Sequence, residues 1–183
     1  MTTTYKDLTR FLQELGTDSV DHSDRKFLAH LVGVYSDLKT WGCDEVVCRV
    51  GMFHSIYGTQ KFQKFCLPLD RREEVRQLIG DRAEWLAYVN CFMDRESFDR
   101  AVLTQGPTYH VRQRVSGEDI ELSADDFDAL CRVHLADWLE QVAHSKQWDY
   151  RRAAYRNLAE RLGGVARESH ERVYALEEAA AAG

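Results

Sequence analysis

The sequence predicts an all-α fold, a helical bundle with one small β-hairpin insertion. Apolar residues recur every three or four positions along most of the chain, which is the spacing of one helix face. The 183 residues include only two prolines, so few positions force a helix to stop. Residues 106–122 break this period and alternate loosely instead, which predicts a hairpin or an extended loop.

The N-terminal third of the chain predicts three helices. Residues 5–15 carry the first apolar stripe, and a polar segment follows it. Ser23 is a candidate N-cap for a long second helix, which Gly42 ends. The third helix starts near Asp44 and continues to Tyr57. Because a short turn joins the two longer helices, we expect them to pack antiparallel and to bring their polar residues together.

The middle of the chain predicts two shorter helices and the hairpin. Asp70 is a candidate N-cap for the first of these helices, and Gly80 ends it. Asp81 begins the second, in which apolar residues again lie at helical spacing, among them Trp85 as an expected core residue. The expected hairpin follows, with its turn around Ser116 and Gly117.

The C-terminal part of the chain predicts the remaining helices. Ser123 is a candidate N-cap, and Asp126 three residues later approximates a capping box. Two further helices follow at residues 148–162 and 165–178, separated by a Gly-Gly pair. The whole chain therefore predicts seven or eight helices and one hairpin.

These elements fit one domain. A chain of 183 residues that is 44% hydrophobic can bury a sizeable core. We expect residues 1–183 to form a single domain, with an N-terminal helix and linker in 1–22 and C-terminal helices in 145–183. The C-terminal helices carry an apolar face that packs on the domain or forms a homodimer contact, and the sequence leaves both open.

Composition and charge exclude two classes of partner. The net charge of −6 gives no basic footprint for binding nucleic acid. No apolar run approaches the roughly 20 residues of a membrane span, and the N-terminus lacks the features of a signal peptide. The five cysteines include no CxxC pair and are expected to be small buried residues. We therefore expect a cytoplasmic protein that binds a small-molecule ligand or substrate.

Three polar residues on apolar helix faces are candidates for a metal site. His30 and His54 lie beside apolar residues on consecutive helices. Asp137 interrupts an apolar stretch, and a carboxylate that faces a core needs a cation or several hydrogen bonds. Two imidazoles and a carboxylate are suitable ligands for zinc, manganese or iron. Residue type alone leaves two alternatives open, a hydrogen-bonded core histidine and a surface aspartate.

The segment HLVGVYSDLKTWGCDEVVCRVGMFHSIYGT carries His30 and His54 on two consecutive helices. It resembles the first half of the HD-domain superfamily of metal-dependent hydrolases, and the nearest pattern is that of the RelA/SpoT-type alarmone (guanosine tetraphosphate) hydrolases. The helix–Gly–helix that follows in this family resembles EEVRQLIGDRAEWLAYV. The family's LADRLxN segment, which holds its last ligand, resembles HLADWLEQ. The resemblance covers roughly residues 27–141 and implies an HD-domain-like bundle with His30, His54 and Asp137 as metal ligands.

Two departures from the family pattern change the expected chemistry. The aspartate that follows the second histidine in the family is Ser55 here, and a hydroxyl adds no charge to a metal site. The family's catalytic Glu-Asp pair falls on Gly58 and Thr59, so HD-xx-ED becomes HS-x-YGT. Because this pair activates water in the alarmone hydrolases, alarmone hydrolysis is not expected.

Other side chains are candidates for the pocket around the ion. Ser55, Tyr57 and Thr59 would line it as catalytic candidates, although Tyr57 also fits a core aromatic and Thr59 a turn residue. His134 lies one helical turn before Asp137 and is a candidate for substrate binding.

Three arginines are candidates for binding an anionic group. Arg112 and Arg114 share a face of the expected hairpin, and Arg95 precedes it in the chain. A guanidinium can bind a phosphate or a carboxylate through two parallel hydrogen bonds. Arginines on a hairpin are also often simply solvated.

Three functional hypotheses follow. The first is a divergent HD-type metal-dependent enzyme, hydrolase-like, that acts on a small molecule. The second is a degenerate HD fold that serves as a metal-free binding or regulatory module. The third is an HD-type iron oxygenase that recruits His110 or His134 as an additional ligand.

Overall fold

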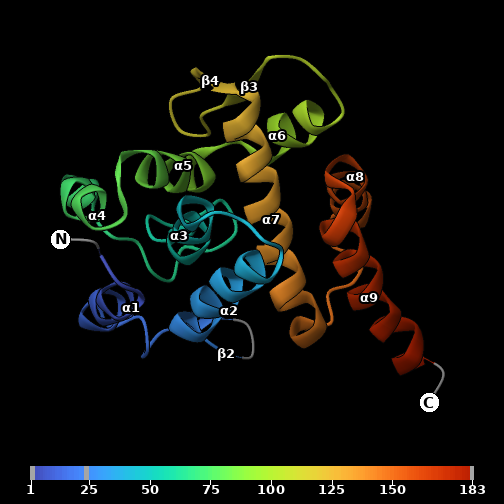
Figure 1. Ribbon diagram of the computed structural model, residues 1–183, viewed down its shortest axis with the longest axis horizontal. Coiled ribbons are helices and arrows are strands. Elements are labelled where there is room, and N and C mark those ends of the chain that lie inside the picture. Colours follow the sequence, from blue (N-terminus) through green and yellow to red (C-terminus); the bar gives the residue numbers. More distant parts are fainter. Residues whose placement is uncertain (1–2, 23–24, 182–183) are drawn as a thin grey trace.

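The computed structural model describes residues 3–22 and 25–181. Within this part the predicted fold class is confirmed, because nine α-helices and an antiparallel hairpin make up most of the chain (Figure 1). The helices are α1 (Tyr5–Glu14), α2 (Phe27–Thr40), α3 (Glu45–Phe53), α4 (Arg72–Ile79), α5 (Asp81–Phe92), α6 (Arg95–Val102), α7 (Ala124–Ser145), α8 (Arg152–Leu162) and α9 (Gly164–Ala181). The short elements are β1 (Asp21–His22), β2 (Arg25–Lys26), η1 (Leu69–Arg71), β3 (Thr108–Arg112) and β4 (Asp119–Ser123).

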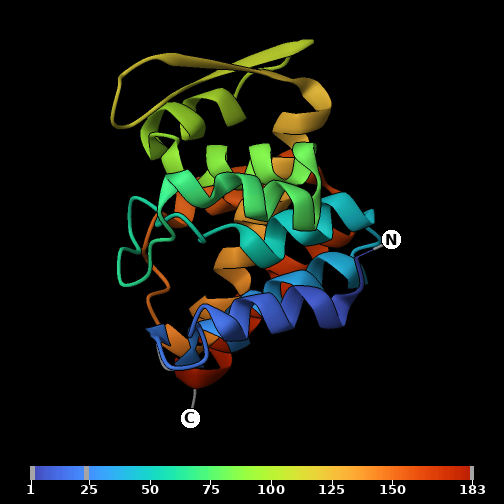
Figure 2. The same ribbon diagram turned by 90° about the vertical axis from the view of Figure 1, so that its left-hand side faces the viewer.

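The longest helix, α7, is the axis of the bundle. Its 22 residues begin at the predicted N-cap, where the Ser123 hydroxyl accepts a hydrogen bond from the Asp126 amide. Figure 1 shows α2 and α3 on one side of α7, and α8 and α9 on the other. Figure 2 shows α1 beside α2, at the end of the molecule away from the hairpin. Since α2, α3 and α8 all pack on α7, side chains from these helices can meet along it.

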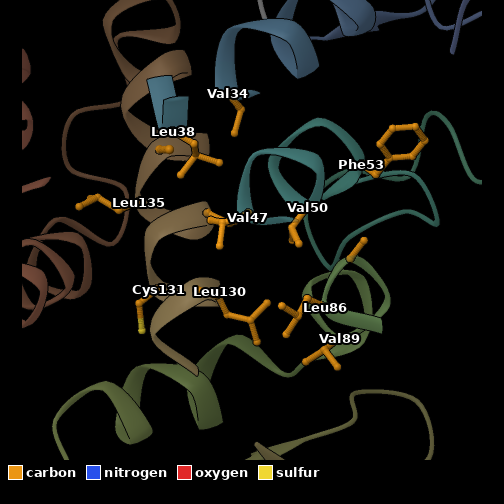
Figure 3. Close-up of a cluster of buried hydrophobic side chains, with 14 of the residues drawn as sticks. Val34, Leu38, Val47, Val50, Phe53, Leu86, Val89, Leu130, Cys131 and Leu135 are labelled. Atoms are coloured by element: carbon orange, nitrogen blue, oxygen red, sulfur yellow. The ribbon is translucent and has the colours of Figure 1, made fainter. Parts of the chain in front are cut away.

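The centre of the core comes from α2, α3, α5 and α7. Figure 3 shows their buried side chains in one cluster, and Leu38, Val50, Leu86 and Leu130 have no exposed surface. Gly51 lets α2 and α3 approach closely, because a Cβ at this position would clash with Leu38. This close approach brings the polar residues of the two helices within reach of one another.

The hairpin lies where the alternating pattern predicts it. β3 and β4 pair antiparallel, with Thr108 opposite Ser123 and Arg112 opposite Asp119. Alternate residues are buried, among them Val111 and the 9% exposed Ile120. The hairpin therefore covers one end of the bundle with its apolar face.

The two helices that carry the histidines are shorter than predicted. α2 begins at Phe27 after Lys26 in the N-cap position, and Ser23, the predicted cap, lies outside the described residues. α3 begins just after Asp44, as predicted, with Asp44 as its N-cap, but ends at Phe53.

The hydrogen-bond pattern changes at the end of α3. The Ile56 amide donates to the carbonyl of Phe53, and the Gly58 amide donates to that of Ser55, each at 3.0 Å and three residues apart instead of four. The carbonyl of His54 accepts a hydrogen bond from the Asn90 side chain at 2.7 Å. The α-helical pattern therefore stops, and the chain turns away before Tyr57.

Other element boundaries also differ from the prediction. α4 follows the 3₁₀ turn η1 with Arg71 in its N-cap position, so Asp70 is not the cap. α8 begins at Arg152, several residues later than predicted, because Lys146 and Arg151 adopt left-handed backbone conformations with φ of 54° and 47°. α6 is absent from the prediction, although Asp94 caps it by accepting from the Ser97 amide.

Two expectations about burial are wrong. Trp85 is 38% exposed, because it lies on the outer face of α5 in a stack with Tyr88. Cys66 is exposed in the loop between α3 and α4, and Cys43 is half-buried. All five cysteines are free thiols. No helix in residues 3–22 and 25–181 is long and apolar enough to span a bilayer.

Candidate metal centre

Three helices bring His30, His54 and Asp137 together. His30 lies in the first turn of α2, His54 caps the C-terminus of α3, and Asp137 lies midway along α7. The histidine side chains are 1% and 0% exposed, and that of Asp137 is 13% exposed. The group is one in which each residue can offer a ligand atom to a single ion. The two imidazoles are thus sealed inside the bundle, and Asp137 provides the opening to solvent.

The distances within the group fit a metal ion. The Nε2 atom of His30 lies 3.1 Å from Asp137 Oδ1, and that of His54 lies 3.3 Å from the same oxygen. The two Nε2 atoms are 3.3 Å apart. A tetrahedral ion with ligands at about 2.0 Å requires ligand atoms about 3.3 Å from one another. The three protein atoms therefore have the spacing of three corners of such a site.

The opposite ring nitrogen of each histidine has its own acceptor. His30 Nδ1 lies 2.5 Å from Glu140 Oε2, and His54 Nδ1 lies 2.6 Å from the carbonyl of Gly51. Since a carboxylate and a carbonyl can only accept, we assign the ring protons to Nδ1. This tautomer leaves the Nε2 lone pairs facing Asp137, which is the arrangement that supports metal-binding histidines.

The electrostatics of the group favour a positive charge at its centre. Burial alone would lower the pKa of His30, but the hydrogen bonds that Asp137 and Glu140 accept from it outweigh burial and raise the pKa to about 9. Burial alone would raise the pKa of Asp137, but His54 and His30 hold it well below its usual range. The site therefore demands a cation, which is a proton on His30 or a metal ion.

The group opens onto a cavity of about 160 Å³. The cavity lies between α7 and the loops that follow α3 and α7, and Asp137 is part of its wall. The wall is completed by polar, cationic and aromatic side chains, namely Ser55, Thr59, Lys61, Phe62, Lys64, Arg95, His134, Trp138, Gln141, Tyr150, Arg151 and Tyr155. An ion held by the three protein ligands would thus keep open positions toward this cavity.

The candidates from the motif segment take different places. Ser55 and Thr59 line the cavity, and Thr59 Oγ1 also accepts from the Phe62 amide. Tyr57 points elsewhere, because its hydroxyl donates at 2.9 Å to the buried carboxylate of Glu84. Tyr57 therefore ties the motif segment to α5, outside the cavity.

The candidates for substrate binding are also divided. His134 lines the cavity. Arg112 lies on the exposed strand β3, beside a separate groove. Arg114 donates to the carbonyls of Cys91 and Gly58 and so holds the hairpin to the bundle. The hairpin arginines thus do not line the cavity, whereas Arg95 is part of its wall.

The sequence did not predict the residues that accept hydrogen bonds from the Nδ1 atoms of the two histidines. Glu140 lies one turn after Asp137 on α7, so helical spacing could have pointed to it. Gly33 makes room for Glu140, because a Cβ there would lie 2.8 Å from Glu140 Cγ. No sequence signal links Gly33 to Glu140, since they meet only when α2 packs on α7.

Glu140 and Gly33 can be tested together. We expect Gly33→Ala to displace the Glu140 carboxylate and Glu140→Gln to weaken its hold on His30. Each change should lower metal affinity about 10- to 100-fold, the usual loss for an outer-sphere partner. Metal titration of the two variants measures this. Gly106→Ala is the matched control, because a Cβ there meets nothing nearer than 3.6 Å; equal losses in all three variants would contradict the role of Glu140.

Of the comparisons with known proteins, the one with family models gives a match. A family model described as a domain of unknown function (DUF6817) matches residues 11–95. This segment is less than half of the chain; it contains both histidines and stops before Asp137. No curated protein and no solved structure matches the chain significantly. The likeness to the HD superfamily therefore remains a hypothesis from sequence.

Proposed function

We propose that this protein is a divergent, HD-like, metal-dependent enzyme that acts on a small molecule by hydrolase-like chemistry. One divalent ion, manganese, zinc or iron, would be held by His30, His54 and Asp137. The observation that carries the proposal is the tight buried group of three ligand atoms at the wall of a cavity. Three protein ligands with an accessible side are typical of catalytic rather than structural metal sites.

Each part of the site has a definable role. When bound, a divalent ion supplies Lewis acidity, which lowers the pKa of water and stabilises negative charge that develops on a substrate. Glu140 and the Gly51 carbonyl orient the two imidazoles before the ion arrives. Ser55 and Thr59 would present their side chains to a substrate in the cavity. The aromatic wall around Trp138 limits the access of bulk water.

Alarmone hydrolysis is not part of this proposal. Asp137 is the only acidic side chain among the residues that line the cavity. Gly58 and Thr59, at the positions of the catalytic acidic pair, supply no carboxylate. A reaction that needs a second carboxylate as general base thus lacks its group here.

The iron oxygenase is the weaker alternative for a specific reason. His110 lies exposed on β3, 3.8 Å from Glu121, and does not line the cavity. His134 lines the cavity, but Arg95 and Arg151 both contact its ring nitrogens. Two guanidinium groups would repel a second metal ion at this place.

Metal analysis of the purified protein tests the proposal. Protein prepared without chelators should contain near-stoichiometric manganese, zinc or iron, or should take up one of these ions after dialysis against a chelator. A panel of hydrolysable small molecules, assayed with and without the ion, then tests for turnover. A chain that neither contains nor takes up metal would support the metal-free binding module, and two irons per chain would support the oxygenase.

A further inference from the structure

The cavity beside the metal group is lined mainly by cations. Lys61, Lys64, Arg95 and Arg151 lie in its wall, and Asp137 is the only carboxylate among the lining residues. The chain as a whole carries a net charge of −6, so this local excess of positive charge runs against its composition. A positively charged cavity in an acidic protein points to an anionic ligand.

Arg151 is anchored by the protein itself. Its guanidinium forms a bidentate ion pair with Asp99 through Nε and a terminal nitrogen. Its backbone is left-handed, with φ of 47°, a conformation that a non-glycine residue rarely adopts. This conformation starts α8 and directs the side chain toward His134 and Tyr155. Arg151 is therefore held rigidly in the wall, with its charge largely compensated.

Arg95 has no such compensation. It is the first residue of α6, and its guanidinium lies in the cavity wall against His134. Among the described residues, no carboxylate lies within ion-pair distance of Arg95, and the nearby charge of Asp137 offsets only part of the effect of its burial. Burial lowers the pKa of Arg95 below its usual range. A half-buried guanidinium that has no ion-pair partner is costly unless a ligand supplies the negative charge.

His134 cannot accept a hydrogen bond from both arginines. Arg95 lies 2.5 Å from its Nδ1, and Arg151 lies 3.0 Å from its Nε2. Burial first, and then the two arginines, hold the pKa of His134 well below its ordinary value, so the ring is neutral. A neutral imidazole has one lone pair, whereas a guanidinium has only donors. One of the two guanidinium groups therefore faces an N–H and needs another acceptor.

We propose that Arg95 and Arg151, on either side of His134, form a subsite that binds an oxyanion group of the substrate. A phosphoryl or carboxylate group supplies the missing acceptors and the missing charge, and both have the geometry that a guanidinium fork binds. His134 lies one helical turn from Asp137, so the oxyanion would be held next to the metal ligands. The anion site itself is inferred from the geometry; that its ligand is the substrate of an enzyme rests on the proposed function.

Calorimetric titration of inorganic phosphate, and separately of malonate, into chelator-treated protein tests the subsite. We expect the wild-type chain to bind at least one of these anions at millimolar concentration, and the two arms distinguish phosphate from carboxylate as the preferred source. Arg95→Met should weaken this binding at least tenfold. Arg95→Lys keeps the charge but not the fork and should weaken it several-fold. Arg112→Met, which removes an exposed arginine outside the cavity, is the matched control and should bind as wild type.

The outcomes separate this subsite from the metal proposal. The anion titrations contain no metal. A negative result in them therefore does not bear on metal binding, and a protein that binds no metal can still be tested for anion binding. No binding of phosphate or malonate to the wild-type chain at 20 mM would overturn the subsite, whether or not the variants fold. Affinities of both Arg95 variants within twofold of wild type would overturn it as well.

Discussion

Replacing His54 with alanine is expected to abolish metal binding. His54 supplies one of three ligand atoms, and its loss leaves His30 and Asp137 as a two-ligand site. Loss of a direct ligand should exceed the 10- to 100-fold effect of an outer-sphere change, so we expect more than a roughly 100-fold drop in affinity. Calorimetric titration of chelator-treated protein with zinc or manganese measures the difference. The same variant should lose any metal-dependent turnover.

Thermal unfolding gives a second measurement of the same site. An ion at 100 times its dissociation constant stabilises the native wild-type chain by about 2.7 kcal/mol, provided that the unfolded chain does not bind it. For a chain of this size, this corresponds to a rise in Tm of roughly 5–10 °C. His54→Ala should show no such rise.

The control for this variant is a second histidine. His110→Ala removes a solvent-exposed imidazole on β3 and should leave both metal affinity and the metal-induced rise in Tm unchanged. The His54 side chain is fully buried, so His54→Ala itself lowers stability, and circular dichroism must first show a folded chain. Folded His54→Ala protein with wild-type metal content would remove His54 from the ligand set.

The sequence predicted most of the helices because local signals specify them. Ser123 is an N-cap as predicted, the third helix starts at Asp44 as predicted, and the alternation in residues 108–123 produces the hairpin. The boundaries that differ depend on tertiary contacts. Where α3 ends, the carbonyl of His54 accepts a hydrogen bond from Asn90 of α5, and no residue near His54 in sequence indicates this contact.

In the site, too, some residues could be predicted from sequence and others depend on helix packing. His30, His54 and Asp137 stand out because each is a polar residue on an apolar helix face, and the structure brings them within reach of one ion. The pairing of Arg95 with Arg151 around His134 has no sequence signature, since it requires α6, α7 and α8 to converge. Such groups become visible only when the packing of the helices is known.

A buried ion pair behind the motif segment is expected to dominate the response of stability to mutation. Glu84 of α5 is 1% exposed and accepts two hydrogen bonds from Arg72, at 2.6 and 2.8 Å. Arg72 also stacks on the ring of Tyr88, the Tyr57 hydroxyl donates to the carboxylate, and Arg76 lies 3.7 Å from it. This network joins the turn after His54 to α4 and α5.

Arg72→Met should destabilise the chain by about 3 kcal/mol, because it leaves the Glu84 carboxylate buried without its main partner. Chemical denaturation measures this loss. The matched control is Arg71→Met, which breaks an exposed ion pair with Glu74 one position earlier in the chain and should cost less than about 1 kcal/mol. The double variant Arg72→Met/Glu84→Gln removes the uncompensated charge but keeps an acceptor for Tyr57, so it should recover much of the loss. A double variant as unstable as Arg72→Met would show that the stacking of Arg72 on Tyr88, rather than its charge, holds α4 and α5 together.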